Sequence, residues 1–464
     1  MNRIVIIGGG ISGLAAAHRV LEFNPAARVT ILEASDRLGG TIHTEHRDGF
    51  LIERGPDSFI SEKPHALALA KRLGIESQLI QTNETYRRSF IVRDGRLRAV
   101  PEGFQLMAPS RLWPFITSDI FSLAGKARMA ADLFLPRRST NGTNDESLAS
   151  FVRRRLGSEA LARMAQPMVG GIYTADPETL SLRATLPRFL EMERKHRSLI
   201  LAMARQGRAQ KTGTSGARYS LFLSFDRGMQ VLVDTLTRMN ADFRVKTRAQ
   251  RLTFDQGWRI NTDQNEEFEA DAVCLAVPAY VAASLLGDVH VGLAKRLRAI
   301  KYASTATINF GYRREAIAHP LNGFGFVVPF IEKRSLIACT FSSVKFSGRA
   351  PDGHVLLRAF AGGALQPDIF ALDEAELSRR VESDLRELLG IREDPRFIEV
   401  AKWERSMPQY EVGHLDRINE IEALVNQLPG LALAGNAYRG AGIPDCIRSG
   451  EAAAKPSTDY AESV

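Results

Sequence analysis

The chain has 464 residues, of which 44% are apolar and 25% charged. This is the composition of a folded globular protein, and it excludes a disordered, collagen-like or disulfide-rich chain. At roughly 150 residues per domain, the length suggests about three domains. Three widely spaced cysteines argue for a reducing compartment and against a structural zinc site. No run of 18 apolar residues is present and the N-terminus resembles a strand, so we expect a cytoplasmic protein without a signal peptide or transmembrane helix.

The net charge of +8 is concentrated in one internal segment. Residues 105–218 hold 18 Lys and Arg against 9 Asp and Glu, a net charge of +9, so the other residues together carry −1. A basic segment favours an anionic partner such as a membrane surface, a nucleic acid or an acidic substrate. The alternative is a solvated basic face with no partner.

The N-terminal region predicts a strand–helix–strand unit around a glycine-rich turn. Residues 3–7 are a short apolar run, 11–22 have helical spacing, and 28–33 form a second strand. A Gly-x-Gly-x-x-Gly motif at residues 8–13 joins the first strand to the helix, and Glu33 ends the second strand. Such a turn lets a pyrophosphate approach the helix N-terminus, and the acid can bind the ribose hydroxyls. We therefore predict a dinucleotide site.

The rest of the chain divides into a helical stretch and a stretch rich in strands. The pattern first predicts a helix at 65–73 and a hairpin at 89–100. The helical stretch follows, with helices at 120–134, 147–156, 159–168 and 184–206 and a loop at 207–218. After a helix at 228–239, strands at 305–312, 324–330, 335–342 and 354–361 predict an antiparallel sheet, and the chain ends with a helix at 373–389, a strand at 431–436 and a helix from Pro444.

The residues after Glu33 distinguish FAD from NAD. Residues 33–41 resemble the Glu-x-x-x-Arg-x-Gly-Gly signature of large FAD-dependent oxidases, in which the arginine and the glycine pair run along the pyrophosphate. Residues 55–58 form a tight turn of the kind that passes the flavin ring. Residues 440–445 lead into a helix whose N-terminus would stabilise negative charge on the reduced flavin.

Four further runs carry a more specific resemblance. They are Glu53–Phe59 (ERGPDSF), Lys195–Leu199 (KHRSL), Met407–Tyr410 (MPQY) and Gly442–Ile447 (GIPDCI). Over nearly its whole length the chain resembles the oxygen-dependent porphyrinogen oxidases of haem synthesis. These include protoporphyrinogen IX oxidase and the coproporphyrinogen III oxidase of many Gram-positive bacteria. The ERGPDSF and KHRSL runs, with Lys63 and Ser89, resemble the Gram-positive form more.

The resemblance implies an α/β fold with three domains. These are a Rossmann-type FAD-binding domain of the amine-oxidase superfamily (1–85, 219–295 and 401–464), a mixed-sheet substrate domain (86–104 and 296–400) and a helical, membrane-associating domain (105–218). In the helical domain, Trp113 and Leu123 beside Arg111 and Lys126 suit a headgroup layer.

The implied reaction is a six-electron oxidation of a porphyrinogen by FAD, with oxygen as acceptor and release of peroxide. Because the flavin carries the chemistry, we assign no catalytic side chain and no metal. FAD is expected to bind without a covalent bond. Its expected contacts are Gly8, Gly9, Gly10, Ile11, Ser12, Gly13, Glu33, Ala34, Arg37, Gly39, Gly40, Thr41, Gly55, Pro56, Asp57, Ser58, Val245, Trp403, Ala441, Gly442 and Ile443.

Only some of the family's substrate contacts have a matching residue in this sequence. The implied residues are Lys63, Arg88, Ser89, Gly171, Val327, Thr340 and Phe360. Ser89 stands where other members have an arginine for a substrate carboxylate, so Lys63 and Arg88 are the alternative cations. Val327 and Phe360 are alternatively core residues of strands, and Lys63 is alternatively a surface lysine without a role.

The resemblance leaves the substrate open. Coproporphyrinogen III, a tetra-acid, is preferred over protoporphyrinogen IX. An amine oxidase of the same fold and a flavin-fold carrier without activity are the other hypotheses. We expect a porphyrinogen and molecular oxygen as partners and no nucleic acid. Peripheral contact with the inner face of the cell membrane and a homodimer are left open.

Overall fold

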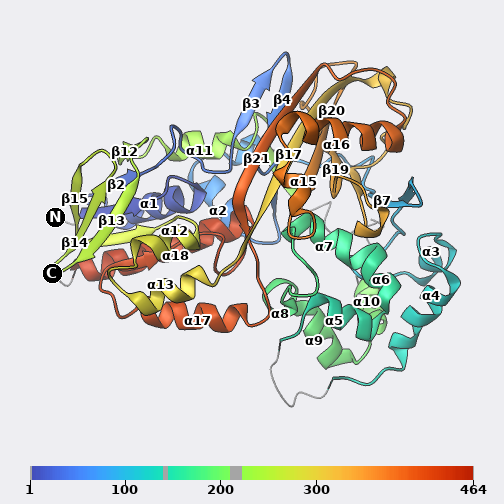
Figure 1. Ribbon diagram of the computed structural model, residues 1–464, viewed down its shortest axis with the longest axis horizontal. Coiled ribbons are helices and arrows are strands. Elements are labelled where there is room, and N and C mark those ends of the chain that lie inside the picture. The colour runs from blue at the N-terminus through green and yellow to red at the C-terminus, as the bar shows by residue number, and fades with distance from the viewer. Residues whose placement is uncertain (1–2, 139–144, 210–221, 463–464) are drawn as a thin grey trace.

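Strands from three distant parts of the chain form one parallel sheet in the computed structural model, which describes residues 3–138, 145–209 and 222–462 (Figure 1). In spatial order the strands are β12 (Asp242–Arg244), β2 (Arg28–Leu32), β1 (Arg3–Ile7), β16 (Ala272–Leu275) and β22 (Leu431–Leu433). The βαβ unit expected at the N-terminus is present, with α1 spanning Ile11–Phe23. All four pairings are parallel, as in a doubly wound nucleotide-binding fold.

The parallel sheet is covered on both faces, because alternate residues of β1 belong to two different hydrophobic cores. Ile4 and Ile6 pack with α1, α2 (His65–Arg72), α11 (Gln230–Leu236) and α18 (Ile443–Glu462). Val5 and Ile7 pack on the other side. That side is closed by α12 (Ala279–Leu285), α13 (Val291–Arg298), α17 (His414–Val425) and a three-stranded sheet of β13 (Ala249–Phe254), β14 (Trp258–Thr262) and β15 (Glu267–Ala270).

A seven-stranded sheet stands beside the parallel sheet. Its order is β21 (Phe397–Pro408), β17 (Tyr302–Arg313), β20 (His354–Gly362), β19 (Ala338–Phe341), β18 (Gly325–Val327), β7 (Phe90–Arg93) and β8 (Arg96–Ala99). The antiparallel arrangement expected for residues 305–361 is confirmed, since β17, β20, β19 and β18 pair antiparallel in that order. The whole sheet is mixed, because β18 also pairs with β7 in parallel. The hairpin β7–β8 comes from before the helical stretch, so no short turn forces it to be antiparallel to β18. Helix α16 (Glu374–Leu389) packs against one face of this seven-stranded sheet, on residues such as Ile308 and Phe310 of β17.

Smaller elements complete these two layers. They are the hairpin β3 (Thr44–Arg47) and β4 (Phe50–Glu53), the sheet β5 (Phe59–Ile60), β11 (Phe222–Phe225) and β6 (Leu79–Gln81), the ribbon β9 (Phe104–Gln105) and β10 (Ala108–Pro109), and the helices α14 (Ser342–Lys345) and α15 (Pro367–Ala371). The predicted boundary between the substrate domain and the last flavin segment, at residue 400, falls inside strand β21. The three domain boundaries themselves stay a prediction.

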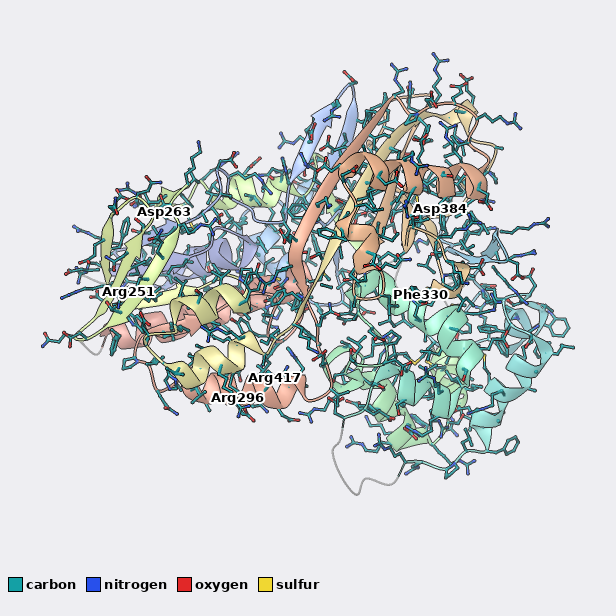
Figure 2. The ribbon with its side chains drawn as sticks, in the orientation of Figure 1. Arg251, Asp263, Arg296, Phe330, Asp384 and Arg417 are labelled. Carbon is teal, nitrogen blue, oxygen red and sulfur yellow. The ribbon has the colours of Figure 1, made fainter. Side chains whose placement is uncertain are left out.

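The helices between residues 112 and 209, called here the helical unit, pack around their own core (Figure 1). They are α3 (Leu112–Thr117), α4 (Leu123–Ala130), α5 (Leu148–Arg155), α6 (Ser158–Ala160), a π-helical turn at Leu161–Ala165, α7 (Gln166–Tyr173), α8 (Leu182–Thr185), α9 (Pro187–His196) and α10 (Leu199–Ala209). Among the described residues, no helix has the length and apolarity to cross a membrane. Phe330, labelled in Figure 2, lies where this unit meets the seven-stranded sheet and donates its N–H to Gln166 Oε1 (2.9 Å).

The helix expected at 184–206 is broken into α8, α9 and α10, and the expectation of one helix is wrong. Arg197 has a left-handed backbone conformation (φ 66°) and ends α9. Ser198 then donates its hydroxyl to Asp132 Oδ2 (2.7 Å) and accepts the Leu201 N–H (3.2 Å), so it starts α10. Helix α10 extends through Ala209, so residues 207–209 are not loop, and the rest of the predicted loop, 210–218, lies outside the described residues.

Asp132 and Arg155 form a fully buried ion pair at the centre of this unit. Arg155 Nε lies 2.7 Å from Asp132 Oδ1, and its other nitrogens bind backbone carbonyls, including those of Pro136 and Arg197. The KHRSL run is therefore held by both charges, since Ser198 contacts the aspartate and Arg197 O contacts the arginine. A structural role accounts for this run.

We predict that Asp132→Ala strongly destabilises the protein. The substitution removes the nearer counter-charge of the buried Arg155 and leaves it only the longer contact with Glu193 (3.6 Å), a loss of about 3–5 kcal/mol. The matched control is Arg153→Ala, which removes an exposed partner of Glu178 and should cost about 0–1 kcal/mol. Thermal unfolding followed by circular dichroism measures both. Equal midpoints for the two variants would contradict a central role for the buried pair.

Candidate active site

The glycine turn between β1 and α1 presents an open helix N-terminus. Gly10 is the N-cap of α1, has no side chain to cap the first turn, and no acidic residue lies in that turn. A Cβ at Gly13 would overlap the carbonyl oxygen of Gly8, so only glycine lets the helix pack this closely against the turn. The backbone N–H groups and the helix dipole together form a cradle for phosphate.

Glu33, directly after β2, holds the shape of this turn. Its Oε2 accepts the Gly9 N–H (2.8 Å) and its Oε1 accepts the Ser35 N–H (2.7 Å). A carboxylate offers about four acceptor positions, so two remain for ribose hydroxyls. The ends of β1, β2 and β12 thus bring residues 8–13, Glu33, Ala34 and Val245 to one edge of the parallel sheet.

The Gly39–Gly40 loop lies directly against the glycine turn. Gly39 donates its N–H to Gly9 O (2.8 Å) and pairs with Gly10 in a β-bridge. The Arg37 guanidinium donates to Ile42 O (2.9 Å) and also to Gly40 O, so this predicted pyrophosphate contact also shapes the loop that ends at Thr41. The residues present therefore fit the ADP half of FAD.

Residues 53–58, the turn expected to pass the flavin ring, lie between the two sheets. Side chains of the seven-stranded sheet bind its carbonyls: Thr307 Oγ1 and Trp403 Nε1 donate to Arg54 O (2.6 and 3.0 Å). Arg358 donates to Gly55 O. A Cβ at Gly55 would overlap the carbonyl of Thr41, so this position accepts only glycine.

A group of buried charges surrounds the same turn. Lys345 Nζ lies 2.9 Å from Asp57 Oδ2 and 3.1 Å from Ser58 Oγ, and Arg358 lies 3.7 Å from Asp57 Oδ1. Burial alone raises the pKa of Asp57, but Lys345 and Arg358 outweigh it and hold that pKa well below its usual range. Asp57 is therefore a carboxylate at neutral pH. Sequence reasoning missed both cations, although a charge inside the apolar run LLRAF (356–360) is a usable signal.

Val327, Thr340 and Phe360 lie on one face of the seven-stranded sheet. Val327 and Phe360 both pair with Ala338 in the β18–β19–β20 register, and Thr340 lies two residues further along β19. Gly171 on α7 faces Val327, since a Cβ built there would lie 3.8 Å from Val327 Cγ1. The predicted apolar walls are therefore brought together between this sheet and the helical unit.

Ser89, the position of the missing arginine, and its neighbour Arg88, one of the two alternative cations, lie on different sides of the sheet. Ile91 pairs with Val327, so alternation places Ser89 on the Val327 face and Arg88 on the opposite face. Arg88 O accepts the Phe324 N–H (2.8 Å). The fold thus separates Arg88 from Val327 and Phe360.

Lys63 contacts the GIPDCI run at the start of α18. Its Nζ lies 2.6 Å from Asp445 Oδ2, and about half of the side chain is exposed. The loop before α18 carries Ala441 and Gly442, and Ile443 begins the helix. This loop is anchored by Tyr410 of the MPQY run, whose hydroxyl accepts the Gly440 N–H (2.9 Å). Lys63 therefore sits beside the helix N-terminus expected near the flavin.

Comparison with known proteins agrees with this geometry. Residues 11–455 match the family of flavin-containing amine oxidoreductases. The chain belongs to this family. It is 36% identical to the coproporphyrinogen III oxidase of Bacillus subtilis over 99% of this chain and 98% of the relative, and 30% identical to the chloroplastic protoporphyrinogen oxidase of Nicotiana tabacum over 98% and 85%. The crystal structure of a putative protoporphyrinogen oxidase from Exiguobacterium matches with a TM-score of 0.88 at 32% identity, covering 99% of both chains.

These matches confirm the resemblance to the porphyrinogen oxidases that the four runs predicted, and they establish a flavoprotein oxidoreductase. The α/β flavin amine-oxidase fold, with its parallel and mixed sheets, is confirmed as well. Within the described residues, no group of His, Cys, Asp and Glu side chains could hold a metal ion. The individual flavin and substrate contacts stay predictions.

We predict that Glu53 makes folding pH-dependent. Burial raises its pKa from about 4.5 to about 7, although Met229 N–H, the Thr44 hydroxyl and nearby arginines oppose the shift. Because the unfolded chain loses this proton first, stability should fall as pH rises from about 4.5 to about 7 and then level off. In Glu53→Gln this fall should disappear, while Glu45→Gln, in the same hairpin, should retain it. Urea unfolding at several pH values measures the free energy of unfolding of each protein. If that free energy depends on pH identically in the wild type and both variants, Glu53 is not its source.

We also predict that Glu33→Ala weakens FAD binding. The variant loses bonds to the glycine turn and to the ribose, each worth about 1.5–3 kcal/mol because the acceptor is charged. Flavin fluorescence titration of the deflavinated protein measures the dissociation constant. Asp36→Ala, which removes an exposed carboxylate in the same segment, is the control. An unchanged constant for Glu33→Ala would remove Glu33 from the FAD site.

Proposed function

We propose that the protein is an FAD-dependent, oxygen-using coproporphyrinogen III oxidase. The whole-chain identity of 36% to an enzyme of that name carries the proposal, and the paired apolar walls beside the flavin turn support it. The reaction consists of three two-electron oxidations. Each removes one hydride and one proton from the porphyrinogen, and three oxygen molecules become three of peroxide. Protoporphyrinogen IX is the second candidate, because the Nicotiana relative is named for it.

The chain's own residues position the macrocycle. When bound, FAD supplies the hydride-accepting chemistry. Val327, Phe360 and Gly171 enclose the apolar ring and exclude water, and Thr340 extends the same wall. Arg358 lies 4.7 Å from the centroid of the Phe360 ring, so it also steadies that wall. FAD binds without a covalent bond: Cys446, the one cysteine in the flavin-side runs, is buried, and burial raises the pKa of its thiol to about 12.

Lys63 is the proposed partner of a substrate carboxylate. An ammonium group has three donors, and the Asp445 contact uses one of them. The remaining donors face solvent at a half-exposed position. A propionate at the pocket mouth would gain a charge-assisted hydrogen bond here, which a tetra-acid can satisfy more readily than a diacid.

The test is an assay of both porphyrinogens under air, followed by porphyrin fluorescence. We expect a higher kcat/KM for coproporphyrinogen III. Lys63→Gln should raise KM about tenfold or more with little change in kcat, since the interaction exists equally in the ground and transition states. Lys71→Gln, an exposed lysine paired with Glu76, is the control. Preference for protoporphyrinogen IX would favour the second candidate, and no turnover of either would refute both.

We also propose that the helical unit makes peripheral contact with an anionic membrane surface. Trp113, Leu123 and Phe134 are 74%, 84% and 81% exposed on α3, α4 and the turn after α4, at the outer edge of the unit (Figure 1). Exposed aromatic and aliphatic side chains beside cations suit a headgroup layer. Two arginines lie nearby in the sequence. Arg137 is exposed, whereas the Arg128 guanidinium donates hydrogen bonds to backbone carbonyls of α5. A homodimer stays a prediction.

Vesicle co-sedimentation tests this contact. We expect binding to anionic vesicles that weakens at high salt, and loss of most binding in the double variant Trp113→Ser, Leu123→Ser. Val291→Ser is the control, because Val291 is 73% exposed but lies on α13, away from this edge. Equal binding to neutral and anionic vesicles, or equal loss in the control, would contradict the proposal.

A further inference from the structure

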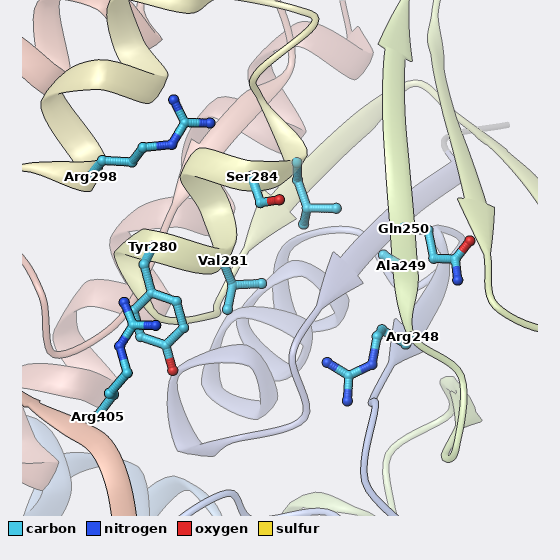
Figure 3. A pocket seen from close by; sticks show the side chains of 9 residues that line it. Arg248, Ala249, Gln250, Tyr280, Val281, Ser284, Arg298 and Arg405 are labelled. Atoms are coloured by element: carbon cyan, nitrogen blue, oxygen red, sulfur yellow. The ribbon is translucent and has the colours of Figure 1, made fainter. Parts of the chain in front are cut away.

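A cavity of about 720 Å³ opens between α12 and β13, and neither the flavin site nor the substrate site assigned above accounts for it. Its walls include three arginines, Arg248, Arg298 and Arg405, together with Tyr280, and no acidic residue lines it. Figure 3 shows Arg298 and Arg405 on the α12 side and Arg248 across from them, on the β13 side. None of the predicted FAD contacts is among the lining residues.

The three arginines differ from their neighbours in lacking a counter-charge. Arg251 and Arg296 pair with Asp288 and Glu420 at the surface (Figure 2). In contrast, none of the three arginines of the cavity forms an ion pair with a carboxylate in the part of the chain that the structure describes. The side chains of Arg298 and Arg405 make neutral contacts: Arg298 donates to Ala283 O (3.3 Å) and Arg405 lies 3.8 Å above the Tyr280 ring. The Arg248 backbone N–H, not its guanidinium, donates to Asp263 Oδ1 (2.9 Å).

The backbone is irregular beside two of the three arginines, Arg248 and Arg405. In β13 the register against β14 shifts between Ala249 and Arg251, next to Arg248. In β21 the register against β17 shifts between Trp403 and Met407, and Arg405 there has a left-handed backbone conformation (φ 44°). Bulges re-aim side chains and recur beside binding sites. The left-handed conformation of Arg405 also indicates a binding site, because the surrounding structure must enforce such backbone strain and strained residues cluster at ligand sites.

We propose that this cavity binds a small organic polyanion carrying at least two phosphate or carboxylate groups. Arginine forks bind either group through two parallel hydrogen bonds. Three unpaired cations around one recess create a positive potential that attracts such a ligand and repel one another when it is empty. Because none of the predicted FAD contacts lines the cavity, the ligand binds the FAD-loaded protein.

Calorimetric titration of the FAD-loaded protein at low salt tests the proposal, with inorganic pyrophosphate and citrate as probes. At least one probe should bind, and comparing them shows whether phosphate or carboxylate is preferred. Arg298→Gln and Arg405→Gln should each weaken binding about tenfold. Arg296→Gln removes the same charge from the same helix, α13, but outside the cavity, so it should bind as the wild type does. Flavin absorbance and thermal midpoints confirm that each variant is folded and loaded.

Three results would overturn the proposal. Neither probe binds the wild-type protein; both cavity variants bind as tightly as Arg296→Gln does; or binding occurs only after FAD is removed. The last result would make the cavity a part of the flavin site.

Discussion

The backbone of residues 53–58 is the constraint on which both halves of the candidate active site depend. It lies between the parallel sheet and the seven-stranded sheet, with Gly55 packed against the carbonyl of Thr41. Thr307, Trp403 and Arg358 bind its carbonyls from three neighbouring strands. The position of the flavin turn relative to the apolar walls is therefore set by hydrogen bonds from the same sheet that carries those walls, and β20 contributes to both.

This arrangement places charged groups where burial is costly. An unpaired buried charge is strongly unfavourable, whereas a network with full hydrogen bonding can hold one geometry. Asp57 forms ion pairs with Lys345 and Arg358, and Lys345 also donates a hydrogen bond to Ser58 Oγ. The network joins the flavin turn to β20 and α14 by charge, whereas Val327 and Phe360 supply the apolar part of the neighbouring wall. Such a division suits an apolar ring with an acidic edge.

Local sequence was sufficient for the nucleotide half of the site. The glycine turn, the following helix and Glu33 are close in sequence, and their spacing specifies one geometry. The long-range partners could not be obtained in this way. Arg358 is 303 residues from Gly55, and Asp132 is 66 residues from Ser198, so no local period reports these contacts. The parallel pairing of β18 with β7 was missed for the same reason, because it depends on where the chain returns after the helical unit.

Amide hydrogen exchange of an Arg358→Met variant tests the central role of this turn most directly. Arg380→Met, on the exposed side of α16, is the control. If the contact of Arg358 with Gly55 holds the turn, peptides covering Glu53–Ser58 should exchange faster in Arg358→Met alone, while those covering β1 should be unchanged. Unchanged exchange of the turn, or an equal increase throughout the protein, would contradict this account.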